Sequence, residues 1–180
     1  QGNIYAEAEI IKDLKFKSLG GIETNIWYNR TWSPKYSWGV KSQENSYLFE
    51  GSNRSITLLW DNTLTYDKTI GKHHINAVVG SSAQNNKYNY LSASVQKFAS
   101  DNTQQIDNGI LQPVHGNASE WAIMSYLGRV NYNFANKYYV TATIRRDGSS
   151  RFGMDNRWGW FPSAALAWRI SNENFLKNST

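Results

Sequence analysis

Two carboxylates near the start of the chain, Glu7 and Glu9, have a spacing that could support acid–base chemistry. Apolar residues alternate with polar ones from Ile4 to Ile10, so the segment reads as a β-strand with both carboxylates on one face. Paired carboxylates on one surface are the groups that a glycosidase uses. A polar lumen or a solvated strand face explains them more simply, and the chain has no Ser-His-Asp order with a nucleophile elbow. We therefore predict that the protein is not an enzyme.

The histidines and the absence of cysteine argue against a metal site. His73 and His74 are adjacent, and neighbouring residues of a strand point to opposite faces, so one ion cannot easily bind both. His115 lies alone in a polar stretch. The chain has no cysteine, which excludes disulfides, zinc–thiolate sites and thiol nucleophiles within it. We expect neither a metal nor another cofactor.

A cluster of aromatic residues is the strongest candidate for ligand contact. Asn and Ser separate these residues, which are Trp27, Tyr28, Trp32, Tyr36 and Trp38. Aromatic faces stack on sugar rings and bury peptide side chains, while Asn and Ser provide adaptable hydrogen bonds. The cluster is predicted to bind substrate. The alternative, that it packs against its neighbours or against a partner protein, is equally compatible with the sequence.

Charge and hydropathy exclude other classes. The formal net charge is +5, but Lys and Arg are scattered rather than gathered on one face, which argues against nucleic-acid binding. No run of 18 apolar residues is present, so a transmembrane helix is not predicted. The chain opens at Gln1 without a signal segment, and its last strand lacks a following partner. We expect it to be a piece of a longer polypeptide.

Period-two alternation predicts an all-β fold with about seven antiparallel strands. It is clearest over 124–134 and 138–144, which flank the turn Ala135-Asn136-Lys137. Further strands are expected over 4–10, 14–26, 56–66, 75–83 and 158–168. The segments 27–55 and 86–119 lack a period and are predicted to be long loops, with a short helix at 91–98 in the second. Gly20-Gly21 and Pro162 are each expected to mark a bulge.

Two architectures produce this pattern: a soluble sandwich, with its apolar faces in a core, and a membrane barrel, with its apolar face toward lipid. The predicted connections alternate between short and long, which places tight turns at one end and elaborate loops at the other. Aromatic residues gather near both ends of the strands, and 14% of the chain is aromatic. Outer-membrane barrels have both properties, whereas a sandwich can show the first by chance.

The last third of the chain closely resembles the SusC/RagA family of TonB-dependent outer-membrane transporters, in its C-terminal barrel region. The matching motifs are Gly128-Arg129-Val130-Asn131-Tyr132, Arg145-Arg146-Asp147-Gly148-Ser149-Ser150-Arg151-Phe152-Gly153, Asn156-Arg157-Trp158-Gly159, Phe161-Pro162-Ser163 and Trp168-Arg169-Ile170-Ser171. The resemblance implies that residues 1–180 are an antiparallel section of a large transmembrane β-barrel, without the plug domain. Such barrels have about 22 strands, so the remaining strands are expected elsewhere.

The resemblance also implies a function. It predicts a transporter in the bacterial outer membrane, of a Bacteroidetes-type organism, that imports oligosaccharides or peptides. The expected partners are a SusD-like surface lipoprotein, TonB through parts of the protein outside this chain, the remaining barrel strands and outer-membrane lipid. Residues chosen from the strand pattern as lumen-facing are Lys15, Lys17, Glu23, Arg129 and Asn131. The alternatives are a secreted β-sandwich that binds glycans and, third, a barrel-type hydrolase.

Overall fold

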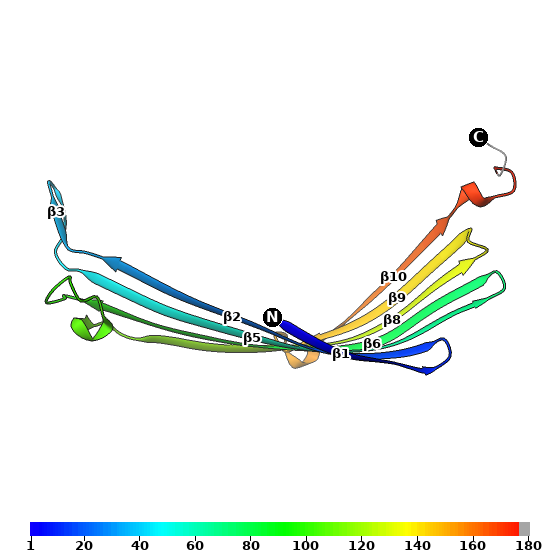
Figure 1. The fold of residues 1–180 in the computed structure, drawn as a ribbon, viewed down its shortest axis with the longest axis horizontal. Helices are drawn as coiled ribbons and strands as arrows, with labels where there is room; N and C mark the ends of the chain where they lie inside the picture. Colours follow the sequence, from blue (N-terminus) through cyan, green and yellow to red (C-terminus); the bar gives the residue numbers. More distant parts are fainter. Residues whose placement is uncertain (177–180) are drawn as a thin grey trace. The chain divides into compact units, whose positions relative to one another are not determined.

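The computed structural model describes residues 1–176 and contains one main antiparallel sheet. Its strands are β1 (Gly2–Ile11), β2 (Leu14–Ser33), β5 (Tyr47–Ile70), β6 (His73–Gln96), β8 (His115–Phe134), β9 (Tyr138–Ser149) and β10 (Trp158–Trp168). They pair in the order β1-β2-β5-β6-β8-β9-β10, so each neighbours the next along the chain (Figure 1). The predicted all-β fold and its seven-strand path are confirmed in the described part of the chain.

The remaining elements are short. β3 (Tyr36–Trp38) and β4 (Lys41–Gln43) form a small hairpin of their own, and β7 (Ile110–Leu111) pairs with the end of β6. Three 3-10 turns lie in connections: η1 (Ile106–Asn108), η2 (Met154–Asn156) and η3 (Ile170–Asn172). The two longest connections, between β2 and β5 and between β6 and β8, therefore carry some ordered structure.

Tight turns link β1 to β2, β5 to β6 and β8 to β9, because their residues accept left-handed backbone geometry. Asp13 has φ of 68° between β1 and β2, and Gly71 has φ of 59° between β5 and β6. Between β8 and β9, Ala135 and Asn136 have φ of 54° and 55°, and the Lys137 amide donates to the Phe134 carbonyl at 3.0 Å. Two consecutive positive φ values define a type I′ turn, whose twist matches that of the flanking strands.

The two predicted long loops are wrong for most of their length. β2 continues to Ser33, β5 begins at Tyr47, β6 continues to Gln96 and β8 begins at His115. The helix predicted at 91–98 is also wrong, because β6 covers most of that segment. Backbone pairing continues where the apolar and polar alternation has ended, since neither face of these extensions is consistently apolar. A reading that depends on hydrophobic periodicity cannot detect such strands.

Neither predicted bulge is present. The β1–β2 ladder passes through Gly20 and Gly21 without interruption, and its register shifts instead between Glu9 and Ile11. The β9–β10 ladder likewise runs unbroken from Trp158 to Trp168, with Pro162 opposite Ile144. β10 is the last strand of the sheet, so a proline whose nitrogen faces its open edge removes no hydrogen bond.

The chain divides into two compact units. The short-turn unit comprises Gln1–Ile22, Leu58–Asn85 and the chain from Trp121 on, and the long-hairpin unit comprises Glu23–Thr57 and Asn86–Glu120. In the long-hairpin unit, Leu48, Val95 and Phe98 form a small core with Trp32 and Ile106 packed against it.

The short-turn unit has no such core among its described residues: none of its large apolar side chains is buried, and many are exposed, for example Leu166 at 81%. A secreted sandwich would bury this surface between two sheets. The alternative is therefore wrong for the described residues.

Candidate functional site

Strand register sorts the side chains of β8, β9 and β10 onto two faces. Tyr126, Arg146 and Trp160 lie opposite one another on one face, and so do Phe134, Tyr138 and Trp168. Because side chains alternate, this apolar face also carries a larger set of residues, which comprises Met124, Val130, Tyr132, Val140, Ala142, Ile144, Trp158, Pro162, Ala164 and Leu166. The opposite, polar face carries mostly Ser, Thr, Asn, Arg and Asp on β8 and β9.

Aromatic rings form a band at each end of the apolar face. At the short-turn end, Phe134 stacks on Tyr138 and Tyr138 on Trp168, with ring centroids 6.3 and 6.4 Å apart. At the other end, Tyr126 stacks on Trp158 at 5.9 Å. The strand length between the bands, from Tyr126 to Phe134, is about 27 Å, or roughly 21 Å of height at a tilt of about 40°. This approaches the ~25 Å apolar band of an outer-membrane barrel.

The polar face carries a hydrogen-bond network that crosses four strands. Asp67 on β5 accepts from Asn76 Nδ2 at 2.7 Å and contacts His74 Nε2 at 3.1 Å, both on β6. The Asn76 side-chain oxygen accepts from Asn131 Nδ2 on β8 at 3.2 Å. Asn131 in turn accepts from the Thr141 hydroxyl on β9 at 2.9 Å. These amide and hydroxyl groups hydrogen-bond to one another across neighbouring strands and form a continuous hydrophilic wall.

Charged residues extend this wall. Arg145 donates through Nε to both carboxylate oxygens of Asp147, at 2.7 and 2.9 Å, and through Nη2 to the Ser125 hydroxyl at 3.3 Å. Arg129 Nε donates to the Thr143 hydroxyl at 3.2 Å. The candidates Arg129 and Asn131 thus lie on the polar face and engage its hydroxyls and amides.

The candidates on β2 also have polar neighbours. Lys15 pairs across the ladder with Glu9, and Lys17 with Glu7. The two carboxylates that first invited an acid–base reading therefore each face a lysine, as expected for a solvated wall. Glu23 lies in the long-hairpin unit and accepts from the Asn25 amide at 2.9 Å.

The two adjacent histidines are separated by the sheet, as predicted. His73 Nδ1 lies 2.6 Å from the Tyr132 hydroxyl, and its ring is 4.9 Å from that of Phe134 on the apolar face. His74 contacts Asp67 on the polar face. Across residues 1–176, no group of three or more His, Asp or Glu side chains could hold a metal ion.

Four of the five aromatic candidates are exposed, and one is packed. Trp32 lies 4.8 Å from Phe98 in an edge-to-face contact, so it supports the core of the long-hairpin unit. Tyr36 and Trp38 lie on β3, and Trp38 is 86% exposed. Trp27 and Tyr28 are strand residues of β2 rather than loop residues, at 51% and 59% exposure. The structure offers stacking surface at these four positions and does not gather them into one pocket.

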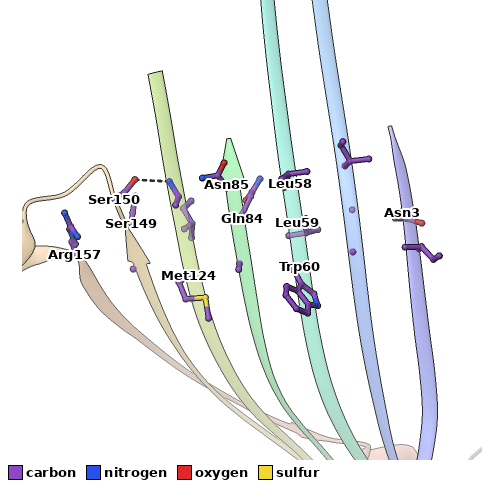
Figure 2. A pocket seen from close by; sticks show the side chains of 18 of the residues that line it. Asn3, Leu58, Leu59, Trp60, Gln84, Asn85, Met124, Ser149, Ser150 and Arg157 are labelled. Atoms are coloured by element: carbon purple, nitrogen blue, oxygen red, sulfur yellow. Dashed lines mark hydrogen bonds between the residues drawn. The ribbon is translucent and has the colours of Figure 1, made fainter. Parts of the chain in front are cut away.

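The short-turn unit also has an apolar hollow of about 910 Å³ (Figure 2). Its lining comes from all seven strands of the main path and includes Leu58, Trp60 and Met124. Three of the lining residues, Gly20, Gly21 and Gly148, have no side chain, which leaves space above the backbone there. At its rim the Ala122 amide donates to the Ser150 hydroxyl at 2.9 Å. Because the lining is apolar, the hollow has few groups to orient a polar substrate.

A carboxylate outside the strands fastens the end of the described chain. Glu173 accepts from Lys137 Nζ at 2.7 Å, from the Tyr138 hydroxyl at 2.8 Å and from Trp168 Nε1 at 3.1 Å. These donors, Lys137 first, lower the pKa of Glu173 from 4.5 to about 2. The turn after β10 is thereby held against the β8–β9 turn, which sequence reasoning did not foresee.

Comparison with known proteins decides the family. No family model matches the chain. TonB-dependent receptor P3 of Formosa agariphila is 34% identical over 183 residues, which cover 99% of this chain and 18% of that protein. TonB-dependent receptor SusC of Bacteroides thetaiotaomicron is 37% identical over 163 residues, 89% of this chain and 16% of that protein. The chain belongs to the TonB-dependent receptor family.

Solved structures place it in the SusC/RagA group of these receptors. A structure of the RagAB peptide transporter matches with a TM-score of 0.88 at 27% identity, over 98% of this chain and 20% of that one. The RagAB peptide importer in its closed-closed state matches with a TM-score of 0.89. The chain spans about a fifth of the length of these relatives. They are receptors and transporters, which agrees with the prediction that the chain is not an enzyme.

No helix within residues 1–176 has the length and apolar character to cross a membrane.

Proposed function

We propose that this chain is part of the wall of a TonB-dependent receptor barrel in the bacterial outer membrane. We call the receptor polypeptide that would contain it the parent receptor. The observation that carries the proposal is the division of one sheet into an apolar face bounded by aromatic bands and a polar face crossed by a hydrogen-bond network. In a barrel these faces meet lipid and lumen respectively.

In this reading, Lys15, Lys17, Glu23, Arg129 and Asn131 face the lumen. Their charges and amides would keep it hydrated and offer weak hydrogen bonds to a passing solute. The substrate class is an oligosaccharide or a peptide, supported by the likeness to SusC and to the RagAB peptide transporter. The exposed rings of Trp27, Tyr28, Tyr36 and Trp38 would contact that substrate on the long hairpins, with Trp32 supporting them from the core.

The proposal extends to the partners. A SusD-like surface lipoprotein would cover the long-hairpin end, and the family likeness supports it. The plug domain and the segment that contacts TonB would be supplied by parts of the parent receptor outside residues 1–180. This chain's own contribution is the wall, its aromatic bands and two of the long hairpins.

The decisive experiment compares two neighbouring positions of β10 that lie on opposite faces. Ala165 pairs with Thr141 on the polar face, and Leu166 pairs with Val140 on the apolar face. A nitroxide label is attached to a single cysteine at either position of the parent receptor in lipid vesicles. Residues 1–180 contain no other cysteine, and any cysteine elsewhere in the parent receptor is first replaced by serine. Oxygen partitions into lipid, whereas a charged nickel chelate stays in water.

We expect the oxygen-to-nickel accessibility ratio to be several-fold higher for the label at Leu166→Cys than for that at Ala165→Cys. Equal ratios, or a higher ratio at Ala165→Cys, would contradict the assignment of faces and with it the proposed function.

A further inference from the structure

Arg146 is the one arginine of β9 on the apolar face. It pairs with Tyr126 on one side and Trp160 on the other, so its side chain leaves the sheet among aromatic residues. Its neighbour Arg145 lies on the polar face, where Asp147 and Ser125 satisfy it. Two consecutive arginines therefore occupy opposite environments, and only one has a counter-charge.

The guanidinium of Arg146 lies against two indole rings. Its Cζ lies 4.7 Å from the ring centre of Trp158 and 5.2 Å from that of Trp160. Its Nε is buried and has no hydrogen-bond partner within residues 1–176. Cation–π contacts offset part of the cost of desolvating a guanidinium, but they supply no hydrogen-bond acceptor for its N–H donors. The geometry therefore leaves a cation oriented for an anion.

A hollow beside this cation provides space for a ligand. It has a volume of about 300 Å³ and is lined by Tyr126, Leu127, Gly128, Ile144, Arg146 and Trp160. The lining is mostly apolar apart from Arg146. A ligand that fits it combines an anionic group with a hydrocarbon portion.

The position along the strand identifies the source of such a ligand. Arg146 follows Tyr138 of the short-turn band by about 27 Å of strand, or roughly 21 Å of height in a tilted barrel. This depth is close to the far boundary of the hydrocarbon layer, where tryptophans and long cationic side chains meet lipid headgroups. Arg146 lies toward the end of β9 that is opposite the tight β8–β9 turn. Short turns of outer-membrane barrels are periplasmic, so this end of the apolar band meets the outer leaflet.

We infer that Arg146, flanked by Trp158 and Trp160, binds the phosphate of an outer-leaflet lipid, whose hydrocarbon begins in the hollow over Gly128. The inference rests on the proposed function, because it requires the apolar face to meet lipid. The guanidinium donates to the phosphate oxygens, and the two indole rings shield that pair from water. The lipid contributes the counter-charge that the chain does not.

The test measures lipid affinity in the parent receptor. Native mass spectrometry of the detergent-solubilised receptor, titrated with bis-phosphorylated lipid A, compares the wild type with Arg146→Gln and Arg145→Gln. We expect Arg146→Gln to weaken binding by about tenfold, because a charge-assisted pair is lost. Arg145→Gln, which removes the same charge from the opposite face, is expected to leave affinity unchanged. Thermal unfolding of each variant confirms that it is folded.

Three outcomes would overturn the inference. They are unchanged lipid affinity in Arg146→Gln, equal losses in both variants, and complete displacement of the lipid by millimolar inorganic phosphate, which would indicate a general anion site. The spin-label experiment on β10 separates this failure from that of the proposed function. If Leu166→Cys meets lipid and Arg146→Gln still binds normally, only the lipid site is refuted.

Discussion

Replacing Gly148 by alanine should disrupt the aromatic band at the long-hairpin end. A Cβ at this position would lie 2.7–2.8 Å from three ring atoms of Trp158, closer than carbon atoms approach in folded proteins. Trp158 cannot retreat with its backbone, because it pairs directly with Gly148 at the end of the β9–β10 ladder. Its ring must therefore rotate away, which breaks the stack on Tyr126 and the contact with Arg146.

The size of the effect follows from these three contacts. Overpacking costs about 1–3 kcal/mol, a lost aromatic pair about 0.5–1.5 kcal/mol and a lost cation–π contact about 0.5–1 kcal/mol. Alanine also lowers the conformational entropy of the unfolded chain relative to glycine, which stabilises the folded state by about 0.4–1 kcal/mol. We therefore expect the free energy of unfolding of the parent receptor to fall by about 1–5 kcal/mol in Gly148→Ala.

Gly128 provides a matched control on the same face. A Cβ there would meet only the Ile144 methyl at 3.4 Å, an ordinary contact, so Gly128→Ala should change stability by less than about 1 kcal/mol. Both free energies are measured by denaturant unfolding in detergent micelles. In a background that carries Trp158→Ala, Gly148→Ala should change the free energy of unfolding much less than it does in the wild type, because the ring that the new Cβ would meet is absent. Equal losses in the two glycine variants, or an unchanged effect in the double variant, would refute the steric argument.

Three further predictions follow from particular contacts. Glu173 has a pKa of about 2 when folded and an ordinary value of 4.5, so its carboxylate stabilises the fold above pH 4.5 and that contribution disappears as the pH falls toward 2. The melting temperatures of wild type and Glu173→Gln should therefore differ at pH 6 and converge near pH 2, and a constant difference would contradict the assignment. Trp32→Ala should destabilise the long-hairpin core by about 1–3 kcal/mol, less than the loss of a fully buried tryptophan because Trp32 is only partly buried. Protection of the core amides from hydrogen exchange measures this loss. Trp38→Ala should leave that protection unchanged, because its side chain is 86% exposed. Ala135→Gly should raise the unfolding free energy by about 1 kcal/mol, because alanine is strained at φ of 54°, and a decrease in denaturant unfolding would show that chain entropy outweighs that strain.

Sequence reasoning located the elements whose two faces differ chemically. β8 ends at Phe134 and β9 begins at Tyr138, as the alternation on either side of Ala135-Asn136-Lys137 predicted. The strand extensions beyond Trp27 and Asn86 escaped it, because their few buried residues, such as Leu48 and Val95, do not recur with a period of two. Periodicity detects a strand only where one whole face is apolar, so it says little where burial is confined to a few positions.

The candidate site was predicted in part for the same reason. Arg129 and Asn131 could be placed on the polar face from parity alone. Trp32 could not be told from its exposed neighbours, since only the distant residues Leu48, Val95 and Phe98 make it a core residue. The special position of Arg146 required the register of three strands, because the sequence Arg145-Arg146 gives both residues the same character.

The unequal strand lengths have a consequence for how such chains diversify. β5 and β6 each have 24 residues, while β9 has 12. In a ladder of period two, an insertion of one residue in a single strand would exchange its faces from that point onward. Insertions that add an even number of residues to a strand, matched on its partner, preserve the faces. The lengths of the two strands of a hairpin should therefore differ between homologous chains by even numbers of residues, added to both strands. The length of a hairpin can then change while each residue keeps its face of the sheet.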